Sequence, residues 1–256
     1  MDAADIMFSL AEAYSTCQTY EDRGLVRHFE QEDVESYRHR IAFKTLYSAP
    51  NKAYFEWVER PLGNPESAPY RVNAFWSDGE KSCLQFFSHE SEKQVPSLDY
   101  AVAASAGLSK GSSVHVFGYL LESLRLKMRT LVRLQEVERL ADERVDGISC
   151  FHLHGRAANG SEENLYIDQE NFLLRRARIC IVIKPGLDEA QYQAIKAADP
   201  VQAEAYRKFR EAQTEERRLW NQIDYHEATI NAGLKDAQFK YEKQGVSDLV
   251  SAFNIL

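Results

Sequence analysis

Two histidines close together in the sequence are the first candidates for chemistry. His152 and His154 lie two residues apart in a stretch with the alternating pattern of a strand, so their side chains share one face. Two imidazoles on one face can bind a transition metal, but a site needs a third ligand, and spacing places no carboxylate beside them. We therefore expect no metal and no cofactor, and interpret both histidines as polar strand residues; a metal-dependent enzyme is the alternative.

Other catalytic signatures are absent from the sequence. There is no Gly-x-Ser-x-Gly nucleophile elbow, no Gly-x-Gly-x-x-Gly dinucleotide motif, and "GLSKGSS" lacks the residue order of a phosphate-binding loop. The acid pairs Glu162-Glu163 and Glu215-Glu216 have the residue type for acid–base catalysis, but nothing in their spacing brings them together across a cleft. We interpret them as solvated charges and predict that the protein is not an enzyme.

The composition is that of a soluble globular protein. The 256 residues are 44% hydrophobic and 27% charged, with a formal net charge of −8. This acidic balance argues against a general nucleic-acid binder, which needs a basic surface. No apolar run approaches the roughly 20 residues that cross a bilayer, so we expect no membrane-spanning segment.

The four cysteines, Cys17, Cys83, Cys150 and Cys180, are far apart and form no Cys-x-x-Cys motif. This spacing argues against a zinc site. Two interpretations stay open: buried free thiols, or one or two disulfides in an oxidising compartment.

Period-two hydrophobicity dominates residues 19–90. In "AYFEWVE", Phe55 and Trp57 share a face opposite Tyr54 and Glu56, and Ser77-Asp78-Gly79 supplies the turn of a hairpin. Strands linked by such short turns form an antiparallel meander. Further strands are predicted at about 130–140, 144–156 and 164–183, and the stretch after residue 217 is predicted to be a strand pair with a turn near 231–233.

Three segments have helical patterns. Residues 2–18 form an amphipathic opening helix. The Ala-rich stretch 97–125 is predicted to be two short helices, separated by Gly107 to Gly111 and each capped by a serine. Residues 187–217 are predicted to be two helices divided by Pro200, inserted into the sheet scaffold. We find no linker, and predict one domain spanning residues 1–256.

Aromatic residues along the early strands are the candidate ligand site. A twisted antiparallel sheet of this many strands curls, and its concave side must be filled by helices, side chains or a ligand. The helices at 97–125 are the expected plug. We predict that an apolar ligand binds the face that carries Phe43, Phe55, Trp57 and Trp76; for any single one of them, plain core packing is the alternative.

Several segments resemble a known family. "TYEDRG", "FWSDGEKS", "GISCFHLHG…NLYIDQENFLLRRARI" and "INAGLKDAQFKY" are similar to strand and turn patterns of the bacterial outer-membrane lipoprotein carriers of the LolA/LolB-like fold, and above all to uncharacterised periplasmic members. The resemblance implies an α+β fold: a large curved antiparallel sheet, an unclosed β-barrel, with plugging helices on the concave side. The helical segment 187–217 has no counterpart in it.

The resemblance and the absence of a reaction centre lead to the same expectation. The protein is predicted to be a non-enzymatic carrier of lipid, lipoprotein acyl chains or another apolar ligand. The resemblance also implies a periplasmic location, with the leader peptide absent from this chain. A cytoplasmic location is the alternative. A second hypothesis is an envelope signalling module that binds a partner protein through residues 187–217.

Overall fold

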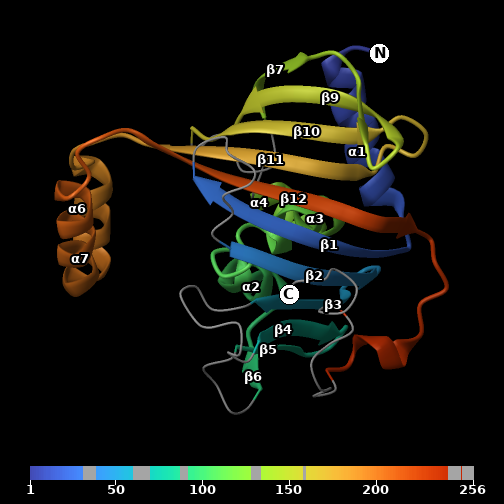
Figure 1. The fold of residues 1–256 in the computed structure, drawn as a ribbon. Coiled ribbons are helices and arrows are strands. Elements are labelled where there is room, and N and C mark those ends of the chain that lie inside the picture. Colours follow the sequence, from blue (N-terminus) through green and yellow to red (C-terminus); the bar gives the residue numbers. More distant parts are fainter. Residues whose placement is uncertain are drawn as a thin grey trace.

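A computed structural model describes residues 1–30, 39–59, 70–86, 92–127, 134–157, 160–241 and 249. In these residues twelve strands form one antiparallel sheet, with helices on its concave side (Figure 1). The strands are β1 (Thr19–Glu30), β2 (His39–Ser48), β3 (Lys52–Glu59), β4 (Arg71–Asp78), β5 (Ser82–Gln85), β6 (Lys93–Val95), β7 (Gln135–Arg139), β8 (Glu143–Val145), β9 (Ile148–Arg156), β10 (Glu162–Asp168), β11 (Leu174–Ile183) and β12 (Arg217–Ile230). The helices are α1 (Ala3–Thr16), α2 (Leu98–Ser105), α3 (Ser112–Leu120), α4 (Glu122–Lys127), α6 (Glu189–Ala198), α7 (Pro200–Glu211) and the 3-10 helix η1 (Asp236–Phe239).

The spatial order of the strands shows two meanders joined side by side. The order is β6-β5-β4-β3-β2-β1-β12-β11-β10-β9-β7, with β8 paired to β9. The pairing of β1 with β12, from Tyr20 opposite Ile230 to Glu30 opposite Leu219, connects the two ends of the chain. Within the described residues β6 and β7 do not pair with each other, so the sheet stays open. The predicted α+β architecture, a curved unclosed sheet with helices, is confirmed.

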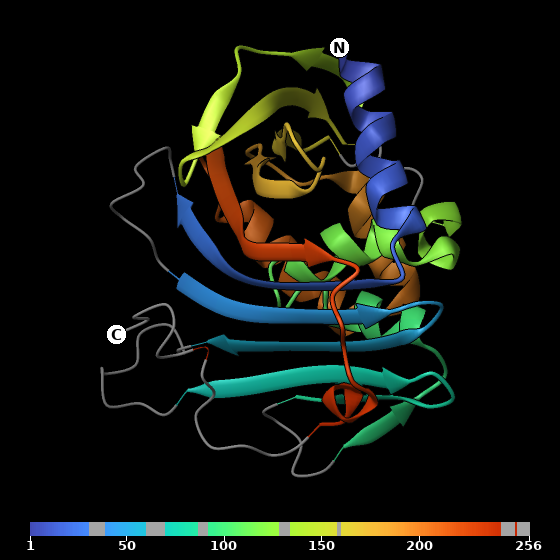
Figure 2. The ribbon, with the colours of Figure 1, turned by 90° about the vertical axis from the view of Figure 1, so that its right-hand side faces the viewer.

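Helices fill the concave side of this curved sheet (Figure 2). In α1, Ile6, Leu10 and Tyr14 recur every four residues, so they form one buried stripe. The Asp2 side chain caps the helix by accepting a hydrogen bond from the Asp5 backbone N–H at 2.8 Å. This confirms the predicted opening helix. Among the described residues, no helix has the length and apolar character needed to cross a membrane.

The plug between the two meanders consists of three short helices. The predicted cap of α2 is confirmed, because Oγ of Ser97 accepts a hydrogen bond from the backbone N–H of Tyr100. The predicted serine cap of the second helix is wrong: α3 follows Gly111, whose φ of 91° is left-handed and which has no capping side chain. A third helix, α4, follows directly.

Two other segments differ from the prediction. The strand expected at 144–156 is split into β8 and β9, because Asp146 and Gly147 both adopt positive φ and form a tight hairpin turn. In the described residues 234–241, the closing strand expected after the turn at 231–233 does not form. Instead η1 inserts Phe239 into an apolar cluster with Leu46 and Tyr54 on the convex face. Alternating apolar residues there serve packing on the sheet, and no ladder forms.

The predicted helical insertion is confirmed as the hairpin α6–α7, which projects from the sheet between β11 and β12 (Figure 1). Pro200 is the first residue of α7, and the Asp199 side chain caps that helix by accepting hydrogen bonds from two backbone N–H groups. Ile183 and Arg217 pair where the hairpin leaves the sheet. Among the α7 residues Ala203 alone is buried.

Candidate functional site

Three of the predicted ligand-binding residues, Phe43, Phe55 and Trp57, lie together on the concave face. The strand register places Phe43 opposite Trp57 and Phe55 opposite Phe75. The ring centroids of Phe43 and Phe55 are 5.8 Å apart, and those of Phe55 and Phe75 are 5.3 Å apart. Phe117 of α3 packs on Phe55 and Phe75, with its centroid 6.3 Å and 5.4 Å from theirs. All three predicted residues are 0% exposed, so the protein's own side chains fill this half of the concave face.

The fourth predicted residue, Trp76, lies on the opposite face. Antiparallel pairing aligns Trp76 with Tyr54, and both side chains point to the convex side. There the ring of Trp76 stacks on that of Tyr241 at a centroid distance of 5.0 Å. The prediction that the four aromatic residues share one face is therefore wrong for Trp76. Alternation shows that Phe75 and Trp76 face opposite ways, but only the register shows that Phe75 is the one beside Phe55.

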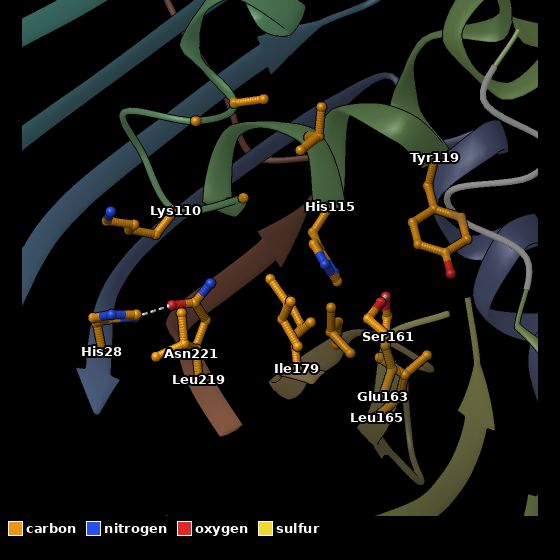
Figure 3. Close-up of a pocket in the computed structure, with 16 residues that line it drawn as sticks. His28, Lys110, His115, Tyr119, Ser161, Glu163, Leu165, Ile179, Leu219 and Asn221 are labelled. Carbon is orange, nitrogen blue, oxygen red and sulfur yellow. Dashed lines mark hydrogen bonds between the residues drawn. The ribbon is translucent and has the colours of Figure 1, made fainter. Parts of the chain in front are cut away.

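A cavity of about 390 Å³ lies in the other half of the concave face. The α2–α3 connection and α3 form one side of it, and β1, β10, β11 and β12 form the other (Figure 3). This volume lies in the range of small-molecule sites. None of the four predicted aromatic residues lines it.

The surface of the cavity wall is mainly apolar, and aliphatic side chains contribute to it from α3, β10, β11 and β12. On β11, Ile179 and Ile181 point to the same face because they are two residues apart. Ile179 is buried, whereas Ile181 is 41% exposed and marks the open rim. The larger aliphatic residues of the wall are Val114, Leu165, Leu174, Ile179, Ile181 and Leu219.

Small residues of the α2–α3 connection leave room for this space. Ala106, Gly107 and Gly111 line the cavity, and a Cβ atom added at Gly107 would meet nothing within 4 Å. The sequence contained this signal as the glycine-bounded break in the Ala-rich stretch. It predicted a plug there, but did not predict which strands would lie opposite.

A buried carboxyl group faces the cavity. Glu163 of β10 is 6% exposed, and this burial raises its pKa to about 7. Its neighbour Glu162 lies on the other face, where Arg156 is 3.8 Å away. The interpretation of Glu162-Glu163 as a solvated pair is therefore wrong for Glu163. Strand alternation places one member of any adjacent pair on the inner face.

Neutral polar groups accompany Glu163. Oγ of Ser161 donates a hydrogen bond to Oε1 of Glu163 at 3.5 Å. Burial lowers the pKa of His115 to about 4 and raises the pKa of Tyr119 above its ordinary value, so both side chains are neutral at pH 7. Figure 3 shows Tyr119, Ser161 and Glu163 at one end of the cavity.

The opposite end carries different polar groups. Nδ1 of His28 lies 2.7 Å from Oδ1 of Asn221, which joins β1 to β12 across the rim. Lys110, on the α2–α3 connection, lies on the same side in Figure 3. The cavity thus has an aliphatic middle and two distinct polar ends.

The histidine pair lies on the convex face. His152 Nε2 and His154 Nδ1 lie 3.0 Å and 3.3 Å from Oδ1 of Asn164. Nδ1 of His152 is also 3.0 Å from Oε1 of Glu143, and its ring stacks on Tyr166. Within the described parts of the chain, no three potential metal ligands come together. These contacts are those of polar strand residues.

The four cysteines are free thiols, and the interpretation of buried free thiols holds for three of them but not for Cys83. Cys17, Cys150 and Cys180 are buried, and Cys83 is partly exposed. Burial raises the pKa of Cys17 and of Cys150 to about 11, which makes both thiols unreactive at neutral pH.

No family model and no curated protein matches the sequence. Solved structures with a similar course of the chain include a DUF1329 family protein from Desulfovibrio piger (12% identity, 93% of this chain and 95% of that one, TM-score 0.37). A LolA superfamily protein from Nitrosomonas europaea matches at 10% identity over 94% of this chain and 98% of that one, with a TM-score of 0.32. MucB from Pseudomonas aeruginosa, solved in complex with MucA, matches at 10% identity and a TM-score of 0.44, and 61% of that chain is covered. The open sheet with helices on its concave side is the architecture that the sequence resemblance implies.

Proposed function

We propose that the protein is a non-enzymatic carrier of a lipid, a lipoprotein acyl chain or another apolar ligand, held in the cavity on the concave face. The observation that carries this proposal is the cavity of about 390 Å³ with its mainly apolar surface. An alkyl chain that buries roughly 300 Å² there would gain roughly 7 kcal/mol, before the loss of chain freedom offsets part of it.

A solvatochromic fatty-acid probe tests this proposal. Leu219 lines the rim, so Leu219→Trp places a large ring in the entrance and should weaken probe binding by at least about tenfold. Leu140 is 38% exposed and lies outside the cavity lining, so Leu140→Trp is the matched control and should leave the affinity unchanged. Absence of probe binding to the wild-type protein, or equal binding by both variants, would refute the carrier proposal.

The aromatic half of the concave face belongs to this proposal as a possible extension of the site. Phe43, Phe55 and Trp57 are 0% exposed, so a ligand could contact them only after neighbouring side chains move; for Phe55 that neighbour is Phe117 of α3, at a ring-centroid distance of 6.3 Å. Their role in binding stays a prediction.

We further propose a bacterial envelope location, the periplasm, on the strength of the sequence resemblance. Recovery of the native protein with the osmotic-shock fraction of its host would support it, and recovery with the cytoplasm would overturn it.

We also propose that residues 1–256 form one domain with 187–217 inserted. The pairing of β1 with β12 in a single sheet supports this.

A second candidate function is partner-protein binding through the α6–α7 hairpin. It is supported by the exposure of apolar side chains on α7, where Val201 is 81% and Phe209 50% exposed. Since Ile183 and Arg217 pair directly, a two-residue turn can replace the hairpin. This deletion should abolish capture of a partner while leaving probe binding intact. Loss of probe binding with capture retained would contradict the second function.

A further inference from the structure

The Glu163 carboxyl group is not explained by carriage of a purely apolar ligand. Glu163 pairs with Gly155 of β9 and Ile179 of β11, so the curved sheet surrounds it on both sides. Its side chain faces the cavity, and its hydrogen bond from Ser161 is at the long limit of 3.5 Å. In the described part of the chain no cationic side chain forms an ion pair with it.

The other titratable groups near Glu163 are neutral. Tyr119 of α3 and Tyr225 of β12 lie within electrostatic reach of Glu163, and His115 of α3 lines the same cavity. Burial keeps the imidazole unprotonated and both phenols protonated at pH 7. Lys110 lies toward the other end of the cavity, on the same side as His28 and Asn221 in Figure 3.

Burial of this carboxyl group opposes folding. A carboxylate loses its hydration in an apolar cavity, and one long hydrogen bond replaces little of it. An aliphatic residue at the same inward position would pack without this cost. A cationic ligand group beside Glu163 would supply the missing partner, because paired charges are tolerated where single ones are not.

We propose that the cavity binds a single-chain amphiphile with a protonated primary amine, whose ammonium group pairs with Glu163. This inference rests on the proposed carrier function. The three N–H donors of an ammonium match the Glu163 carboxylate and the hydroxyl oxygens of Ser161 and Tyr119. The alkyl chain extends from there past Ile179 toward the rim at Ile181.

This arrangement places the polar head of the ligand inside and its tail toward the opening. A carboxylate head would meet the like charge of Glu163 at the inner end and could be held only at the Lys110 end. The head group of the ligand therefore decides whether and how it enters. Amine, alcohol and carboxylate with the same chain separate these cases.

The experiment measures displacement of the bound fatty-acid probe by dodecylamine, dodecanol and dodecanoate at about pH 8, where Glu163 is ionised. Dodecylamine should displace the probe at a concentration at least about tenfold lower than dodecanol. Glu163→Gln should remove this preference, so that dodecylamine and dodecanol displace the probe at similar concentrations. Glu162→Gln, on the opposite face of the same strand, is the matched control and should keep the preference.

A second measurement uses the wild-type protein alone. Lowering the pH from about 8 to about 5.5 protonates Glu163 and should weaken dodecylamine binding at least fivefold, while dodecanol binding stays constant. Equal binding of amine and alcohol, tighter binding of dodecanoate, or an amine preference that survives Glu163→Gln would overturn the inference. In each of those cases the carrier function stands, whereas failure of every amphiphile to displace the probe would refute both.

Discussion

The two halves of the concave face differ in how their space is filled. Around β2–β5, rings of Phe55 and Phe75 stack on one another and meet Phe117 of α3. Around β10–β12, aliphatic residues such as Ile179 face the same helix across a cavity of about 390 Å³. Aromatic rings supply enough volume to close the distance between sheet and helix, whereas aliphatic and glycine residues do not. A dense set of aromatic residues therefore indicates packed core here, and the cavity lies beside it, where aliphatic and glycine residues predominate over aromatic ones.

Truncating one buried side chain in each half should give the largest difference between the two halves. Phe55→Ala removes a 0% exposed ring with four ring neighbours and should lower the free energy of unfolding by about 3–5 kcal/mol. Ile179→Ala enlarges a space that already exists, so its cost should be at the low end for aliphatic truncation, about 2 kcal/mol. Urea denaturation of both variants measures the difference. Equal losses would show that the hollow half is as tightly packed as the other.

The buried carboxyl of the hollow half should make stability depend on pH. Glu163 has a folded-state pKa of about 7, above its ordinary value of 4.5, so the folded protein binds more protons between these values. The free energy of unfolding therefore falls as pH rises through this range, by on the order of 3 kcal/mol. Glu163→Gln should remove this part of the dependence and be the more stable protein at about pH 8.

The control for this titration is Asp22, whose pKa burial also raises to about 7. Its contribution has the same sign and remains in Glu163→Gln, so the two proteins are compared by their difference at each pH. A difference that does not change between about pH 4.5 and pH 8 would show that Glu163 is not buried as described.

Alanine substitution of one glycine in each half tests how closely the backbone is packed there. A Cβ atom at Gly24 would lie 2.0 Å from Cζ of Phe43, so Gly24→Ala should cost about 1–3 kcal/mol through overpacking. At Gly107 the same atom would meet nothing within 4 Å, and Gly107→Ala should change stability by less than about 0.5 kcal/mol. Thermal melting of both variants tests this. A large loss at Gly107 would mean that the connection packs against the sheet.

The sequence predicted the strands better than it predicted the site. Period-two alternation depends only on neighbours along the chain, so the sequence correctly placed Phe55 and Tyr54 on the two different faces of the sheet. The face on which Trp76 lies depends on the register between β3 and β4. The position of Phe239 depends on tertiary packing against the sheet. Neither the register nor this packing can be read from neighbouring residues in the sequence. The cavity combines residues from strands and helices far apart in the sequence. For Glu163 the sequence contained one indication, which is a charged residue at an inward-facing position of a predicted strand.

Substitution of Trp57 should have the smallest effect on stability and on probe affinity. It tests whether the proposed binding site extends into the aromatic half. Trp57 is 0% exposed, and its Nε1 has no hydrogen-bond partner among the described residues. Trp57→Phe therefore removes an unpaired buried donor and should fold with little loss of stability. If the ligand occupies the cavity alone, the probe affinity should change less than about twofold, since Trp57 is not part of the lining. A loss of more than about fivefold would show that α3 moves aside and that the aromatic half joins the site, as the sequence predicted.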